Sequence, residues 1–125
     1  MKNILLVEDD PLVMKTLKKF FKKLGFGIKT ATNGKEALQQ VEKYEIYLII
    51  SDLKMPVMKG DALFAEVRDR GFKMPFFLLT GYTDHTSIEI LKNMGIQGVI
   101  EKPVEFKKLE NALKGYLGSP VTKLH

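Results

Sequence analysis

The sequence has no cysteine and only two histidines, His85 and His125, among its 125 residues. The absence of cysteine excludes disulfides, a thiolate zinc site and a cysteine nucleophile. We expect both histidines to be exposed rather than to act as ligands or phosphohistidines. No apolar run approaches membrane-spanning length, and the run at 4–7 is too short for a signal peptide. We therefore expect a cytoplasmic protein without a membrane segment.

The formal net charge of +5 raises the question of an anionic partner such as nucleic acid. Many of the lysines fall between residues 11 and 24, where they alternate with apolar residues at helical spacing. The lysines are Lys15, Lys18, Lys19, Lys22 and Lys23, and the residues predicted to face a core are Leu12, Val13, Leu17, Phe20, Phe21 and Leu24. We interpret the lysines as a solvated helix face, so direct nucleic-acid binding is not expected. Docking on an acidic partner or DNA is the alternative.

Apolar runs and helical patterns alternate five times along the chain, which predicts a doubly wound parallel sheet in one domain. The predicted strands are 4–7, 28–31, 47–50, 76–79 and 98–101, and the predicted helices are 11–24, 35–43, 58–70, 86–93 and 105–117. Gly118-Ser119-Pro120 ends the last helix. We therefore predict a domain at 1–117 and a tail at 118–125, either a native end or the stump of a linker to an output domain.

Two helix starts carry capping signals. Asp10 precedes Pro11, which suits an N-cap followed by the first helical position. Asn33 stands three residues before Glu36, as in a capping box. Asp10 is therefore assigned to capping and not to the acidic site described next.

Polar residues follow four of the predicted strands: Glu8 and Asp9, then Asp52, Thr80 and Lys102. In an open parallel sheet, ligands bind beyond the carboxyl ends of the strands, where the strand order reverses. If the order is 2-1-3-4-5, the three acids converge, and a hard cation such as Mg²⁺ is the natural means of neutralising them. Asp52 is the candidate nucleophile for a phosphoryl group, with Lys102 and Thr80 supplying a positive charge and a hydroxyl to its oxygens.

The same residues resemble the receiver domains of two-component response regulators, over about residues 3–117. The motifs that carry the resemblance are Leu5-Leu6-Val7-Glu8-Asp9, Ser51-Asp52-Leu53-Lys54-Met55-Pro56 with Gly60, Leu79-Thr80-Gly81 and Glu101-Lys102-Pro103. Each motif alone is weak. Together, in this order and each at a strand end, they are specific.

The resemblance implies a flavodoxin-like (βα)₅ three-layer sandwich and a role for each site residue. Asp52 is the phosphoacceptor, and Mg²⁺ is bound by Asp9, Asp52 and the main-chain carbonyl of Lys54, with Glu8 holding a metal-bound water. Thr80 and Lys102 bind the phosphoryl group, and the peptide bond after Lys102 is expected to be cis. A sensor histidine kinase or phosphotransfer protein is the implied phosphodonor.

The sequence departs from the family pattern at positions that bear on switching. Many receivers have an aromatic residue three positions before the lysine, where this chain has Val99. We expect Thr80 to move toward the phosphoryl group with little aromatic reorientation; Gly81, in place of the commoner alanine, loosens the same loop. Lys54 and Tyr82 occupy the two variable positions that, in the family, modulate loss of the phosphoryl group, and we predict a long-lived phosphorylated form.

Rival functions are weighed by the residues they require. Phosphatases of the haloacid dehalogenase class place an acid two residues after the nucleophile, where this chain has Lys54. A flavin carrier would need a phosphate loop after the first strand, and a nucleotide switch would need G-x-x-x-x-G-K-[ST]; the sequence has neither. A phosphorylation-independent pseudo-receiver is the remaining rival. We therefore expect a switch and not an enzyme with turnover. The switch would act through an output domain or target protein and could dimerise on phosphorylation.

Overall fold

The chain alternates between strands and helices as its apolar runs predict. The computed structural model describes residues 2–81 and 85–117, and within them five strands alternate with five helices. In chain order they are β1 (Asn3–Val7), α1 (Pro11–Lys23), β2 (Gly27–Ala31), α2 (Gly34–Lys43), β3 (Ile46–Asp52), α3 (Gly60–Asp69), β4 (Phe76–Thr80), α4 (His85–Asn93), β5 (Gly98–Glu101) and α5 (Phe106–Leu113). None of the helices in these ranges is long and apolar enough to cross a bilayer. The predicted tail at 118–125 lies outside the described residues.

The strands form one parallel sheet in the order β2-β1-β3-β4-β5, which confirms the predicted fold. β1 lies beside β3, with Leu5 opposite Ile49 and Val7 opposite Ser51. The strand order reverses at this pair, because β2 lies on one side of β1 while β4 and β5 lie beyond β3. This is the point where sheets of this class bind ligands.

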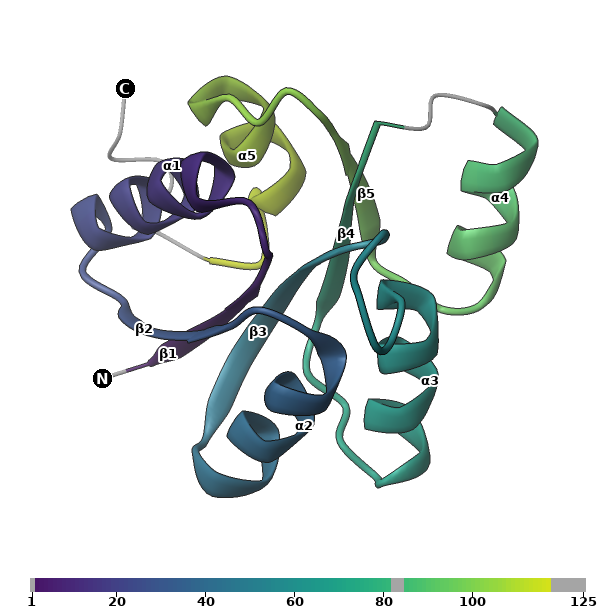
Figure 1. Ribbon diagram of the computed structural model, residues 1–125. Coiled ribbons are helices and arrows are strands. Elements are labelled where there is room, and N and C mark those ends of the chain that lie inside the picture. Colours follow the sequence, from purple (N-terminus) through teal and green to yellow (C-terminus); the bar gives the residue numbers. More distant parts are fainter. Residues whose placement is uncertain (1, 82–84, 118–125) are drawn as a thin grey trace.

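Helices cover both faces of the sheet and make three layers (Figure 1). Leu5 and Val7 of β1 pack in a core cluster with residues of α2 and α3, while Ile4 and Leu6 pack in a second cluster with residues of α1 and α5. Successive residues of a strand point to opposite faces. Both faces are buried, so the strand reads as an uninterrupted apolar run.

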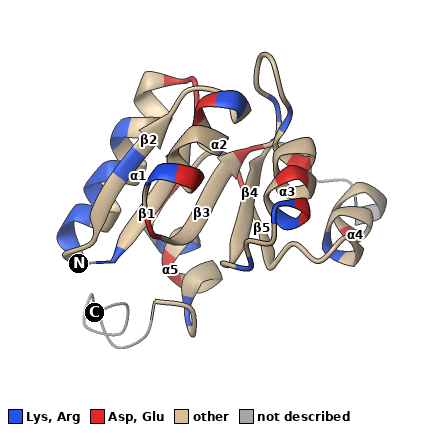
Figure 2. Ribbon diagram, turned by 90° about the horizontal axis from the view of Figure 1, so that it is seen from below, with Lys and Arg blue, Asp and Glu red and all other residues tan. Residues whose placement is uncertain are grey.

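Helix α1 buries one side and exposes the other. Leu17, Phe20 and Phe21 are buried, whereas the lysines assigned to the solvated face are all exposed and lie along α1 in Figure 2. The prediction that Leu12 faces the core is wrong, because its side chain is 76% exposed. Leu12 precedes Leu17 by five positions, which at 3.6 residues per turn places it about 140° around the helix from the buried face.

The predicted caps are present, with one difference. The backbone N–H of Leu12 donates to Asp10 Oδ1 at 2.9 Å, and the N–H of Glu36 donates to Asn33 Oδ1 at 2.9 Å. The Glu36 carboxylate, however, accepts from the N–H and the hydroxyl of Thr32, at 2.7 and 2.9 Å, and not from the N–H of Asn33. These bonds lower the pKa of Glu36 below its ordinary value. In a capping box, Glu36 would accept from the N–H of the N-cap residue Asn33. Here it accepts from Thr32, the residue before the N-cap.

Candidate functional site

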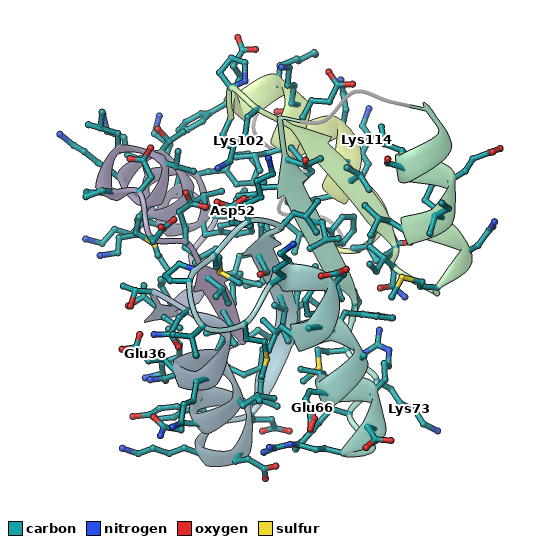
Figure 3. All side chains as sticks on the ribbon, turned by 45° about the vertical axis from the view of Figure 1, so that its right-hand side comes forward. Glu36, Asp52, Glu66, Lys73, Lys102 and Lys114 are labelled. Carbon is teal, nitrogen blue, oxygen red and sulfur yellow. The ribbon has the colours of Figure 1, made fainter. Side chains whose placement is uncertain are left out.

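Four strands present polar residues at one edge of the sheet. Glu8 directly follows β1, Asp52 and Thr80 end β3 and β4, and Lys102 directly follows β5. Backbone hydrogen bonds between neighbouring strands continue to this edge. The N–H of Glu8 donates to the carbonyl of Ala31 at 3.0 Å, and the N–H of Lys102 donates to the carbonyl of Thr80 at 2.9 Å. Figure 3 shows Asp52 and Lys102 close to one another at this edge.

The structure brings the three predicted acids together. Glu8, Asp9 and Asp52 each offer a carboxylate oxygen, and these oxygens lie within 4.8 Å of one another. Glu8 and Asp52 are buried, with exposed fractions of 1% and 5%, while Asp9 is open to solvent. The pairing of β1 with β3 causes this convergence, because it aligns Val7 with Ser51 and so places the following acids side by side.

Lys102 spans the two buried acids. Its Nζ lies 2.9 Å from Asp52 Oδ2 and 3.4 Å from Glu8 Oε1. The side chain of Lys102 is 28% exposed, so it is partly open to solvent. The Lys102–Pro103 peptide bond is cis, as predicted.

Burial and neighbouring charges shift the pKa values of Glu8 and Lys102. Burial raises the pKa of Glu8 from 4.5 to about 8, together with the hydrogen bond and the charge of Asp52, while the Lys102 charge opposes the rise. Burial lowers the pKa of Lys102, but the hydrogen bond to Asp52 and the charges of Glu8 and Asp52 outweigh it and raise that pKa overall. Glu8 therefore holds its proton near neutral pH, and Lys102 stays charged.

The donor set fits a hard divalent cation. Glu8 Oε2 is buried and has no hydrogen-bond partner, a costly state for a carboxylate oxygen. Asp9 and Asp52 supply further carboxylate oxygens, which could act as metal ligands together with Glu8. Oxygen ligands with one solvent-accessible side suit Mg²⁺, which keeps several waters and takes few carboxylates.

The remaining predicted residues surround the acids or fall outside the described part. Thr80 is buried, with an exposed fraction of 3%, and Lys54 is exposed two residues after Asp52. Val99 is half-buried, lies opposite Leu78, and packs against the core cluster that contains residues of α2 and α3. Tyr82 and His125 lie outside the described residues, and nothing is described of the His85 side chain.

Two residues support Asp52 that the sequence analysis did not assign. The hydroxyl of Ser51, fully buried, donates to the Asp52 carbonyl at 2.9 Å. Gly60 begins α3, and a Cβ there would overlap the same carbonyl oxygen. In the sequence, Ser51 stands out as a polar residue at the end of an apolar strand, which is a signal for a supporting role. For Gly60, the only signal in the sequence is its place in the family motif.

Comparison with known proteins identifies the family. The model of the response regulator receiver domain matches residues 4–114. The chain belongs to this family. Receiver domains are the phosphoacceptor modules of two-component signalling, so the chain is a signalling switch of this class.

Known receivers share both sequence and structure with this one. The chemotaxis response regulator CheY4 of Vibrio cholerae is 29% identical with a TM-score of 0.84, over 93% of this chain and 98% of that one. The receiver domain of the sensor histidine kinase PA1611 of Pseudomonas aeruginosa, with a magnesium ion coordinated in its active site cleft, is 25% identical with a TM-score of 0.82, over 94% and 98%. The transcriptional regulatory protein GlrR of Escherichia coli is 32% identical over 89% of this receiver and 25% of that protein. The receiver spans about half the length of the first curated relatives it matches.

Proposed function

We propose that Asp52 is the residue that accepts the phosphoryl group. The observation that supports it most is the position of its carboxylate: buried, 2.9 Å from the Lys102 ammonium, and beside Glu8 and Asp9. Asp52 Oδ attacks phosphorus, the new O–P bond forms, and the bond from phosphorus to the donor's leaving atom breaks, with its electron pair going to that atom. For a phosphohistidine donor the leaving atom is an imidazole nitrogen.

The residues proposed to hold Mg²⁺ are Asp9, Asp52 and the main-chain carbonyl of Lys54, with Glu8 acting through a bound water. Bound there, Mg²⁺ neutralises charge on the transferring phosphoryl oxygens. Glu8 would contribute by releasing its proton to solvent when the site is loaded. The unpartnered oxygen of Glu8 supports this role, because it leaves a buried acceptor available for a water.

Lys102 and Thr80 are proposed to bind the phosphoryl oxygens. Before transfer, Lys102 holds Asp52 and Glu8 with its ammonium group. After transfer, the same ammonium pairs with a phosphoryl oxygen, because the Asp52 oxygen has lost its charge. The Thr80 hydroxyl, at the end of the neighbouring strand β4, donates to a second oxygen and draws the following loop with it.

This loop leads into α4. We propose that movement of the loop changes the surface formed by α4, β5 and α5, and that partners recognise this change. Val99 replaces the aromatic group of many receivers, so the signal passes mainly through the backbone after Thr80.

Lys54 and Tyr82 are proposed to slow the loss of the phosphoryl group to water. Residues 1–117 form the receiver, and 118–125 a tail or linker.

The proposed partners are a sensor histidine kinase or phosphotransfer protein as donor, and an output domain or target protein as receiver of the signal. The names of relatives such as GlrR, a transcriptional regulatory protein, support an output domain. Dimerisation on phosphorylation, a cytoplasmic location and an absence of catalytic turnover beyond autodephosphorylation complete the proposal.

Acetyl phosphate with Mg²⁺, followed by intact-mass measurement, tests the assignment. Wild type is expected to gain one phosphoryl group, and Asp52→Asn is the matched control, since it keeps the size of the side chain and removes the nucleophile. An adduct that persists in Asp52→Asn would contradict the assignment. Phosphate release from many substrates would indicate a phosphatase, and no adduct on folded wild type would indicate a pseudo-receiver.

A further inference from the structure

The loop between β3 and α3, which follows the proposed phosphorylation site Asp52, holds a strained residue. Val57 has a backbone φ of +73°, a conformation that β-branched residues rarely adopt. The N–H of Met58 donates to the carbonyl of Pro56 at 2.8 Å, which closes a γ-turn around Val57. Val57 is 77% exposed, so its own packing does not offset the strain. Other contacts must hold the loop in this shape.

Backbone hydrogen bonds fasten the start of the loop to β4 and its end to its start. The N–H of Leu53 donates to the carbonyl of Leu79, and the N–H of Gly60 donates to the carbonyl of Leu53, each at 2.9 Å. A Cβ at Gly60 would overlap the Asp52 carbonyl and lie 2.7 Å from the Leu78 side chain. The loop therefore leaves and rejoins the sheet at the same place.

The middle of the loop is fastened to a different element. Met58 is half-buried and packs against the core cluster of α2 and α3. Gly34, the first residue of α2, lies directly against it: a Cβ built on Gly34 would be 2.7, 2.9 and 3.0 Å from Met58 Cβ, Cγ and Sδ. Met58 thus fills the space that a side chain at position 34 would occupy.

We propose that Met58 is a positioning residue for the metal site: wedged against the bare backbone of Gly34, it holds the loop in the strained shape that aims the Lys54 carbonyl at the ion. Lys54 lies between the carbonyl of Leu53, which accepts from Gly60, and the buried side chain of Met55. In this proposal, Met58 holds the part of the loop that follows and so keeps the Lys54 carbonyl in its direction. The strain at Val57 is the cost of that shape, and the contact between Met58 and Gly34 offsets it. This inference rests on the proposed role of the Lys54 carbonyl.

Gly34→Ala tests the contact by forcing Met58 away. We expect the Mg²⁺ dissociation constant, from calorimetric titration of the full chain, to rise about tenfold, the size of effect seen when the support of a metal ligand is disturbed. The matched control is Gly98→Ala at the opposite edge of the sheet, where the new Cβ would lie 2.9 Å from the Phe77 ring. It creates a comparable clash, and its Mg²⁺ affinity is expected to equal that of wild type.

A second variant, Met58→Ala, removes the wedge without adding a clash. We expect it to weaken Mg²⁺ binding similarly and, in the metal-free protein, to change the HN–Hα coupling constant of Val57, which reports its φ. Unchanged Mg²⁺ affinity in folded Met58→Ala overturns the proposal, even if Gly34→Ala does not fold. If wild type itself binds no Mg²⁺, or Asp9→Asn binds it as well as wild type does, the proposed metal site is wrong. If only the positioning role of Met58 is wrong, wild type still binds Mg²⁺ and Asp9→Asn still binds it more weakly.

Discussion

Lys102 Nζ lies 2.9 Å from Asp52 Oδ2, although fifty residues separate the two in the sequence. The same ammonium lies 3.4 Å from Glu8, so one cation serves two buried acids. In the metal-free protein Lys102 therefore provides part of the charge compensation that we propose Mg²⁺ provides when it is bound. If Mg²⁺ binds as proposed, it should compete with Lys102 for the acids and cooperate with it only once a phosphoryl group supplies further oxygens.

Lys102→Gln should separate these two effects. Without the ammonium, Mg²⁺ binding should tighten by about tenfold, because a like charge a few ångströms from the ion is removed. Phosphorylation by acetyl phosphate should nevertheless fall, since a phosphoryl oxygen loses its cation. Calorimetric titration and intact mass measure the two quantities. Lys73→Gln, an exposed lysine outside the site, is the control. Weaker Mg²⁺ binding in Lys102→Gln would contradict this account.

Glu8 should make the stability of the metal-free protein fall as the pH rises. Its folded-state pKa of about 8 lies above the ordinary 4.5, so the folded protein binds the extra proton between these values. The resulting stabilisation is complete below pH 4.5 and is lost as the pH rises through 8, at about 1.4 kcal/mol per pKa unit. Urea unfolding of wild type and Glu8→Gln from pH 5 to 8.5 checks this. Equal slopes in the two proteins would refute it, and saturating Mg²⁺ should reduce the wild-type slope.

Val57→Asn should stabilise the protein by about 1 kcal/mol, because asparagine tolerates positive φ far better than valine does. The melting temperature of the metal-free protein should rise by about 4 °C. Val57→Ala is the control, since it removes the exposed apolar group but keeps a Cβ at positive φ. If alanine raises the melting temperature as much as asparagine, exposure rather than strain is responsible.

Lys54 and Tyr82 should govern how long the phosphoryl group remains. Lys54→Ala and Tyr82→Ala are each expected to shorten the half-life of phosphorylated Asp52, because water gains access to phosphorus. Intact mass followed over time after removal of acetyl phosphate measures it. Half-lives equal to that of wild type in both variants would show that neither side chain screens the site.

Thr80 should move when the site is filled. Comparing backbone and methyl NMR signals with and without a phosphate mimic is expected to show shifts at Thr80 and along the loop into α4, with only small shifts at Val99. An unmoved Thr80 would mean that switching in this receiver follows another route. Thr30, exposed on β2, provides an internal reference.

Much of the fold follows from local patterns. The apolar runs of β1, β3 and β4 predict strands buried on both faces, and the structure places alternate residues such as Leu5 and Leu6 in different core clusters. Helical periodicity located α1 but misplaced Leu12, because a broad apolar pattern does not say how far the buried stripe extends around the helix. The end of α5 at Leu113 was also missed: Gly115 has φ +88°, while Leu117 remains buried beyond the last helical turn.

The sequence by itself determined which chemical groups stand at the ends of the strands, since a buried strand followed by acids, a hydroxyl or a lysine is readable residue by residue. Only the tertiary structure decided that Glu8 and Asp52 share one lysine, that Glu8 keeps a proton to about pH 8, and that Met58 rests on Gly34 beside a strained Val57. The reason is physical: charge coupling, desolvation and steric contact depend on distances between residues far apart along the chain, and strand pairing and packing set those distances.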